Sequence, residues 1–238
     1  MCVVALALAV HPDWPVILIG NRDEYHARPA APLHQWTDGS AIIAGQDLQA
    51  GGTWMGVHPP TGRMVVVTNV RGDLPDPTKA SRGALVTQLL SGTGPYATIG
   101  ADPDSAPAML DDFNAFNLIM VGSGTGHILT NRPAPDLRPI HSGIFALANE
   151  PASAPCPRAD TLRSRLAHCV ANASDPQHLL DDLMDCDPPA LFLTGDIYGT
   201  RASTLFLQNR AGEIFMTERQ YEAGGRPHGT TALLSQIG

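Results

Sequence analysis

Two apolar runs open the chain. Residues 2–10 and 16–20 are almost entirely aliphatic, with many β-branched side chains. The spacer at 11–15 contains two prolines and an aspartate, and its length suits a hairpin connection. The pattern therefore predicts two neighbouring antiparallel strands.

Further runs along the chain predict an alternation of strands and helices. Four helices are expected. Three of them are 81–90, with Ser81 as N-cap candidate; 158–171, with one apolar face; and a segment beginning at the Asp175 N-cap, whose Met184 is expected to face inward. A proline-rich loop is expected at 26–36. Strands are expected at 41–44, 64–70, 116–121, 127–131, 137–140, 144–148, 203–208 and 213–217, and a short helix at 105–113.

The order of these elements is typical of an α+β fold. Connections are mostly short, and the chain shows no internal repeat or low-complexity linker. We therefore expect one domain over residues 1–238, built from largely antiparallel sheet. Helices covering the sheets would give an α/β/β/α sandwich.

Composition narrows the function classes. The chain has 238 residues, a formal charge of -8 and only one lysine, which argues against nucleic acid as a partner. No segment reaches the roughly 20 apolar residues that a membrane-spanning helix needs, so no integral membrane segment is expected. The four cysteines show neither a metal-binding spacing nor a disulfide pattern, which favours the cytoplasm.

Cys2 is the first candidate for chemistry. Aminopeptidases remove Met1 when the second residue is small, and the mature chain would then begin with a free α-amino group on Cys2. An α-amine has a pKa of about 8 and can act as the base for the thiol of its own residue. The alternative interpretation is that Cys2 is a small buried apolar residue at the start of a strand.

The tetrad Asn21-Arg22-Asp23-Glu24 closes the second predicted strand. The hairpin brings it toward the edge that carries Cys2. Arg22 would lower the pKa of the thiol, and Asp23 could hold the α-amine in place. Alternatively, the tetrad is a solvated turn with local ion pairs.

Taken together, these motifs resemble the NRDE family, also called the transport and Golgi organisation family. The resemblance runs along most of the chain and includes seven motifs in the expected order. These are Met1-Cys2, residues 21–24 with Arg28-Pro29, the glycine-rich 51–56, Thr68-Asn69, Ser81-Arg82-Gly83, residues 148–151, and Tyr198-Gly199-Thr200-Arg201 ahead of Ser203-Thr204.

That family is similar to the N-terminal-nucleophile hydrolases of the penicillin V acylase and bile salt hydrolase type. The resemblance implies Cys2 as the nucleophile, with Arg22 and Asp23 beside it. It also implies Asn69 and Asn149 as oxyanion donors and Arg201 as a supporting arginine. In the acylases the arginine and aspartate are separated by two residues, whereas Arg22 and Asp23 are adjacent. Either asparagine could instead cap a turn.

Two functions follow as hypotheses. The first is an enzyme that hydrolyses or transfers an acyl group from a small-molecule amide or related acyl substrate through Cys2. The second is a carrier that binds haem or a lipid such as acyl-CoA on the same scaffold. The nine histidines lack the spacing of a zinc helix, so no catalytic metal is expected. No cofactor is predicted either. Nothing in the pattern indicates an oligomeric state.

Overall fold

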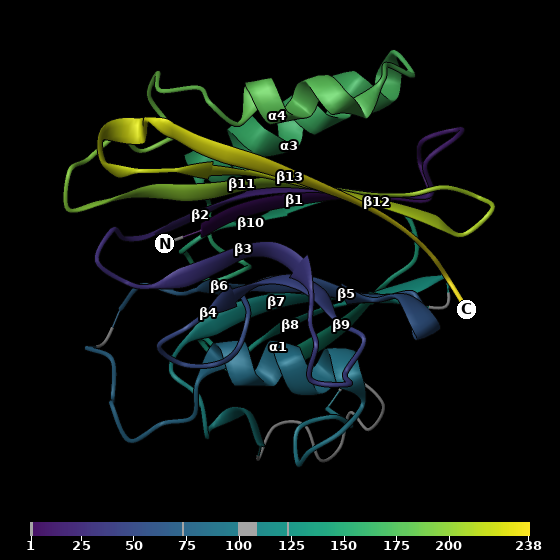
Figure 1. Ribbon diagram of the computed structural model, residues 1–238. Helices are drawn as coiled ribbons and strands as arrows, with labels where there is room; N and C mark the ends of the chain where they lie inside the picture. The colour runs from purple at the N-terminus through teal and green to yellow at the C-terminus, as the bar shows by residue number, and fades with distance from the viewer. Residues whose placement is uncertain (1, 73, 100–108, 123) are drawn as a thin grey trace. The chain divides into compact units, whose positions relative to one another are not determined.

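The computed structural model describes residues 2–72, 74–99, 109–122 and 124–238 (Figure 1). They form two compact units, each assembled from segments that are distant in the sequence. The first unit contains the chain up to Arg28, His141–Ala148 and Pro155–Ile237. The second contains Pro29–Ile140, Asn149–Ala154 and Gly238. Whether the two units act as one domain over residues 1–238 stays a prediction.

The first unit is built on a six-stranded antiparallel sheet. The first two predicted strands pair within it, and the second continues through the tetrad at residues 21–24. The strand order is β10-β1-β2-β11-β12-β13. The strands are β1 (Cys2–Leu8), β2 (Val16–Tyr25), β10 (Gly143–Leu147), β11 (Tyr198–Gln208), β12 (Glu213–Tyr221) and β13 (Pro227–Gln236), with the short 3-10 helix η3 (Ala223–Gly225) before β13.

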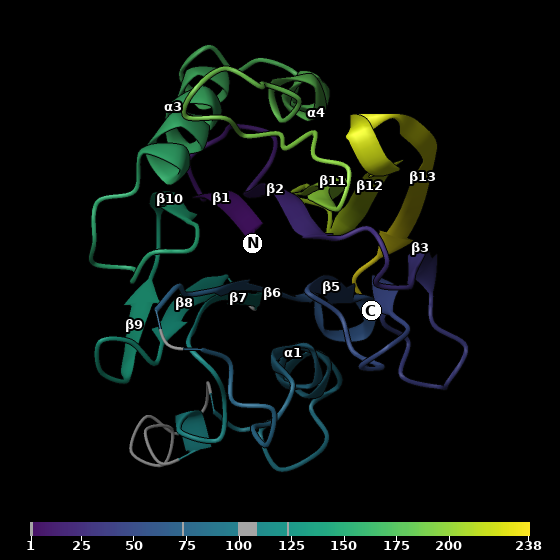
Figure 2. The same ribbon diagram turned by 90° about the vertical axis from the view of Figure 1, so that its left-hand side faces the viewer.

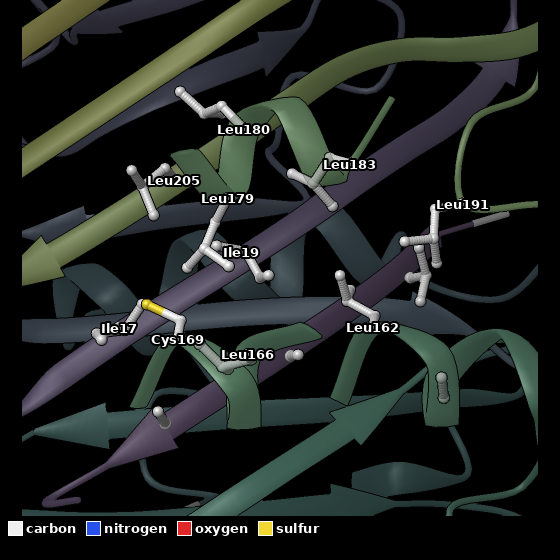
Figure 3. Packing of buried hydrophobic residues seen from close by; sticks show 14 of the residues in the cluster. Ile17, Ile19, Leu162, Leu166, Cys169, Leu179, Leu180, Leu183, Leu191 and Leu205 are labelled. Carbon is white, nitrogen blue, oxygen red and sulfur yellow. The ribbon is translucent and has the colours of Figure 1, made fainter. Parts of the chain in front are cut away.

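Helices cover one face of this sheet. Figure 1 shows α3 (Pro157–Ala171) and α4 (Leu179–Asp182) lying against it, with the 3-10 helix η2 (Pro176–His178) leading into α4. The Asp175 side chain accepts a hydrogen bond from the Gln177 main chain, as a helix cap does. Strand and helix side chains interleave in the buried cluster (Figure 3), which includes Val3, Ala5, Ile17, Ile19, Leu162, Leu166, Leu179, Leu183 and Leu205.

The second unit is a seven-stranded antiparallel meander, in which each strand pairs with the next in sequence. The helix α1 (Arg82–Ser91) packs on this sheet (Figure 2). The strands are β3 (Ala30–Gln35), β4 (Ile43–Asp47), β5 (Met55–His58), β6 (Arg63–Asn69), β7 (Phe116–Gly122), β8 (Thr125–Thr130) and β9 (Asp136–Ile140), with the 3-10 helix η1 (Pro59–Thr61) between β5 and β6.

The predicted α+β class with antiparallel sheets is confirmed, but three strands were missed: β3, β5 and β13. β3 occupies most of the segment expected to be a proline-rich loop. It tolerates Pro32 because it is an edge strand whose register shifts between Ala31 and His34. β13 is also an edge strand, and its mostly exposed residues lack a buried apolar face that a pattern could reveal.

Smaller differences concern the helices. Met184 is 38% exposed, so its predicted inward orientation is wrong. Of the helix expected at 105–113, residues 105–108 lie outside the described residues. In the part of the chain that the structure describes, no helix is both long and apolar enough to cross a membrane.

Candidate functional site

Cys2 begins β1 and lies directly opposite Arg22 of β2 in the antiparallel register. Directly opposed residues point to the same face of a sheet, and successive residues point to opposite faces. Val3, the next residue, belongs to the core under the helices. Cys2 and Arg22 therefore face away from the helices. Asp23 faces toward them.

Cys2 is buried, with 8% of its surface exposed. Burial raises the pKa of its thiol, and the Asp23 carboxylate raises it further. Arg22 and a hydrogen bond from the Asp23 main-chain N–H lower this pKa, but burial has the larger effect. The sequence-based expectation about Arg22 has the right direction, yet the thiol as a whole has a raised pKa because little water reaches it.

Arg22 is part of a small charged group at the end of β2. Its guanidinium lies 3.7 Å from the carboxylate of Glu24, and the Arg28 guanidinium lies 3.9 Å from the same carboxylate. Alternation puts Arg22 and Glu24 on the face that carries Cys2. The tetrad is thus part of a paired strand, and the alternative of a solvated turn is wrong.

The Asp23 side chain is fully buried on the helix side. One carboxylate oxygen accepts a hydrogen bond from the Thr200 hydroxyl at 2.8 Å, and the other lies 2.6 Å from Nη1 of Arg158 in α3. Arg158 also donates from Nε to the Ala190 carbonyl at 3.0 Å and from Nη2 to the Leu191 carbonyl at 2.6 Å. A buried carboxylate is therefore held by a cation that is itself fixed at three points.

The Tyr198–Arg201 motif secures the same strand from β11. The Tyr198 hydroxyl donates to the main-chain oxygen of Asp23 at 2.8 Å. Burial raises the pKa of this phenol, and the nearby groups of Cys2 and Asp23 add to the rise. Arg201 lies at a shift in the register between β11 and β2. The shift falls between Thr200, which pairs with Asp23, and Ala202, which pairs with Arg22.

Arg201 itself supports the chain that leaves β2. Its Nη1 lies within 3.0–3.1 Å of three main-chain carbonyls, those of Tyr25, His26 and Arg28. Burial lowers the pKa of Arg201, and the neighbouring Arg22 lowers it further. The role that the structure supports is to hold the segment after the tetrad in place.

Asn69 and Asn149 belong to the second unit, where they contact each other. Asn149 Nδ2 donates to the main-chain oxygen of Asn69 at 2.8 Å, and the main-chain oxygen of Asn149 accepts from the Arg71 N–H at 2.7 Å. Asn149 is buried, while Asn69 is half-buried at the end of β6. Their contact ties two distant segments of the unit together.

Two residues of this region were missed by sequence reasoning as members of the site. Arg158 carries a faint signal, because a cation in the first turn of a helix is disfavoured by the helix dipole and calls for an explanation. No role of its own was predicted for Asn21, which belongs to the tetrad. Its Nδ2 donates to the carbonyls of Leu183 and Leu191 at 2.8 Å, and its Oδ1 accepts from Ser203 at 2.6 Å.

Cys2, Arg22, Asp23 and Arg201 are thus brought together in the first unit, while Asn69 and Asn149 come together in the second. Metal chemistry gains no support from the described ranges, where His, Cys, Asp and Glu side chains form no group of three or more suited to a metal ion. What the first unit offers is a buried thiol with cations on both faces of the sheet.

Comparisons with known proteins agree on one family. A family model described as Transport and Golgi organisation 2 matches residues 1–223. The Transport and Golgi organization 2 homolog of Mus musculus is 25% identical over 265 residues, which covers 92% of this chain and 92% of the relative. The Homo sapiens homolog shows the same identity and coverage. The Drosophila melanogaster protein is 25% identical over 158 residues, covering 60% of this chain and 55% of that protein.

Proposed function

The chain belongs to the Transport and Golgi organisation 2 family, and from this premise we propose that it is an N-terminal-nucleophile hydrolase or acyltransferase. It cleaves an amide or related acyl bond of a small molecule through Cys2, after removal of Met1. The proposal includes the four-layer α/β/β/α sandwich and a single functional domain over residues 1–238, both of which come from the resemblance to the acylases.

The observation that carries the proposal is the register of β1 and β2. Cys2 lies opposite Arg22, and the strands are antiparallel. Moving from Cys2 toward the amino terminus therefore corresponds to moving from Arg22 toward Asp23. The α-amino group of a Cys2 freed of Met1 would point along β1 to the level of Asp23. This supports the predicted role of Asp23 as the group that holds the amine.

The raised pKa of the thiol fits this chemistry. A thiol with a raised pKa supplies little thiolate near neutral pH, so the reaction needs a base beside the sulfur. In the proposed mechanism the α-amine takes the proton from Sγ while the sulfur attacks the acyl carbon. The amine then gives that proton to the leaving group as the C–N bond breaks, and water or another acceptor releases the acyl group from Cys2.

The tetrahedral intermediate needs hydrogen-bond donors for its negative oxygen, and each donor can contribute about 2.7–4 kcal/mol. We propose the side-chain amides of Asn69 and Asn149 for this role. Asn149 uses one N–H for the carbonyl of Asn69, and an amide nitrogen carries two hydrogens. The second hydrogen is available chemically for an oxyanion.

The test has two steps. Intact-mass spectrometry first establishes whether the purified protein begins at Cys2. A panel of amides and thioesters is then searched for a mass increase on Cys2, with Cys2→Ala as the inactive variant and Cys186→Ser as the matched control at an exposed cysteine. We expect acylation that Cys2→Ala abolishes and Cys186→Ser leaves intact. Active protein that retains Met1 would refute the mechanism, because an acylated nitrogen is no base.

A carrier is the second candidate. The names of the relatives refer to transport, and a binding protein on this scaffold would be consistent with a transport role. Haem and acyl-CoA titrations of the wild type and of Cys2→Ala separate the two functions. Equal binding by both proteins, together with no acylation across the panel, would favour the carrier. Under either function a cytoplasmic location stays a prediction.

A further inference from the structure

We propose that Arg158 is a positioning residue for Cys2, which acts from the opposite face of the sheet by fixing the Asp23 carboxylate and balancing its charge. The inference rests on the proposed function, since it concerns proton transfer at Cys2. Arg158 does not touch the sulfur in this scheme. Its effect passes through Asp23, the residue that follows the partner of Cys2 along β2.

The contacts of Arg158 and Asp23 fix both side chains in place. Nη1 of Arg158 lies 2.6 Å from Oδ2 of Asp23, while Nε and Nη2 donate to the carbonyls of Ala190 and Leu191. The three nitrogens of one planar guanidinium therefore each have a partner, which fixes both the position and the plane of the group. On the other side, Thr200 donates to Oδ1 of Asp23.

The position of Arg158 in α3 is electrostatically unfavourable by itself. It is the second residue of the helix, after Pro157, and the positive end of a helix dipole disfavours a cation there. The carboxylate of Asp23 offsets this cost. A cation kept at such a place, and buried to 15% side-chain exposure, indicates that its contact with Asp23 has a specific use.

The titratable and charged groups of this region come from three elements. β2 contributes Arg22, Asp23 and Glu24, β11 contributes Tyr198 and Arg201, and α3 contributes Arg158 through Asp23. An uncompensated carboxylate at Asp23 would raise the pKa of the thiol and of a nearby α-amine alike. A protonated amine cannot accept the proton of the thiol. Arg158, by balancing Asp23, lets the amine and the thiol exchange a proton near neutral pH.

The experiment measures the pH dependence of Cys2 alkylation by iodoacetamide, with each cysteine followed separately by peptide mass spectrometry. In Arg158→Gln, the midpoint for Cys2 is expected to rise by about one pH unit, which makes alkylation about tenfold slower below the midpoint. Arg163→Gln, on the exposed side of α3, is the matched control and should leave the midpoint unchanged.

Two further variants separate charge from structure. Arg158→Lys keeps the charge but cannot reach the carboxylate and both carbonyls at once, so the midpoint should stay near that of the wild type while stability falls. The double variant Asp23→Asn with Arg158→Gln removes both charges and keeps hydrogen-bonding groups. Its midpoint should return close to the wild-type value.

Asp23→Asn alone gives an independent measurement, even where Arg158→Gln does not fold. In Asp23→Asn the positive charge of Arg158 is no longer balanced, so the alkylation midpoint of Cys2 should fall below that of the wild type. An unchanged midpoint in Asp23→Asn or in Arg158→Gln overturns the inference, as does a double variant that keeps the full shift of Arg158→Gln. A wild-type Cys2 that no substrate acylates would refute the proposed function instead. The alkylation midpoints of the variants would still test the role of Arg158.

Discussion

The family motifs have different structural roles in the two units. In the first unit, the tetrad and the Tyr198–Arg201 motif supply polar side chains that are buried and bound to each other, as in the contact of Thr200 with Asp23. In the second unit, the motifs around Gly52 and Gly83 supply glycines. A Cβ on Gly52 would lie 2.4 Å from the main-chain carbon of Gly83, so only glycine permits the approach of these two segments.

The two kinds of contact differ in the chemistry that they allow. Both pairs of motifs join segments that are distant in sequence, and both can be recognised equally well from the amino-acid sequence. One pair brings together ionisable groups whose charges must be balanced, and the other lets two main chains meet. Only the first arrangement can move a proton. Chemistry should therefore be sought where buried motif residues carry charge, and the second pair is better explained by packing.

The largest predicted effect is at the buried ion pair. Arg158→Ala leaves the carboxylate of Asp23 buried without its cation, and breaking such a pair costs about 3–5 kcal/mol. The free energy of unfolding in urea measures this loss. Arg163→Ala, which breaks an exposed pair with Asp160 on the same helix, should cost about 0.5 kcal/mol. Equal losses in the two variants would mean that the buried ion pair stabilises the fold no more than the exposed one.

The glycine contact of the second unit gives the next largest effect. Gly52→Ala forces the main chain of Gly83 to move, and overpacking of this kind costs about 2–3 kcal/mol. Gly122→Ala is the matched control, because its nearest neighbour would lie at 3.6 Å, an ordinary contact distance, and little change is expected. Thermal unfolding of both variants tests the contrast. A neutral Gly52→Ala would remove the packing explanation for this motif.

Much of this arrangement could be predicted from the sequence. Apolar runs on both sides of a turn were enough for β1 and β2, and their pairing brings Cys2 to Arg22 as expected. The alternation of strand side chains also bears on Arg22 and Asp23: adjacent residues face opposite ways, so the two cannot both flank the sulfur through their side chains. The resemblance to the acylases alone did not reveal this.

The partner of Asp23 could not be predicted in the same way. Arg158 follows Asp23 by 135 positions in the sequence. Its contact with Asp23 depends on how α3 packs on the sheet. Burial of Cys2 is likewise a tertiary property, and it decides the direction of the thiol pKa against the local effect of Arg22. Local patterns predict strands and their pairing, whereas the electrostatic balance of a site depends on contacts between distant segments.

A smaller effect separates the two faces of the first sheet. Ser203 faces the helices and donates to Asn21 at 2.6 Å, so Ser203→Ala should cost about 1–2 kcal/mol by leaving a buried acceptor without this donor. The neighbouring Thr204 faces the other way, and its buried hydroxyl has no hydrogen-bond partner among the described residues. Thr204→Val should therefore be neutral or slightly stabilising. Urea unfolding of the two variants decides, and similar losses would contradict the assignment of polar contacts to the helix side.

The smallest effect is an alkaline one, and it probes the face that carries Cys2. The pKa of the Cys2 thiol is raised in the folded protein above its ordinary value of 9.0. The folded state therefore holds this proton more tightly than the unfolded state does. Its contribution to stability is complete below about pH 9 and is lost as the pH rises toward the folded pKa, by at most about 1.4 kcal/mol per pH unit.

Cys2→Ser removes this titration and should flatten the fall in unfolding free energy between about pH 9 and pH 10.5, whatever its effect at pH 7. Cys186→Ser, at an exposed cysteine, should keep the wild-type slope. Tyr198 also has a raised pKa and contributes to the remaining slope, so Tyr198→Phe in the Cys2→Ser background should flatten it further. Parallel curves for the wild type and Cys2→Ser would mean that the thiol is as well hydrated as in the unfolded chain. In that case burial of the thiol would no longer be an argument for a base at Cys2.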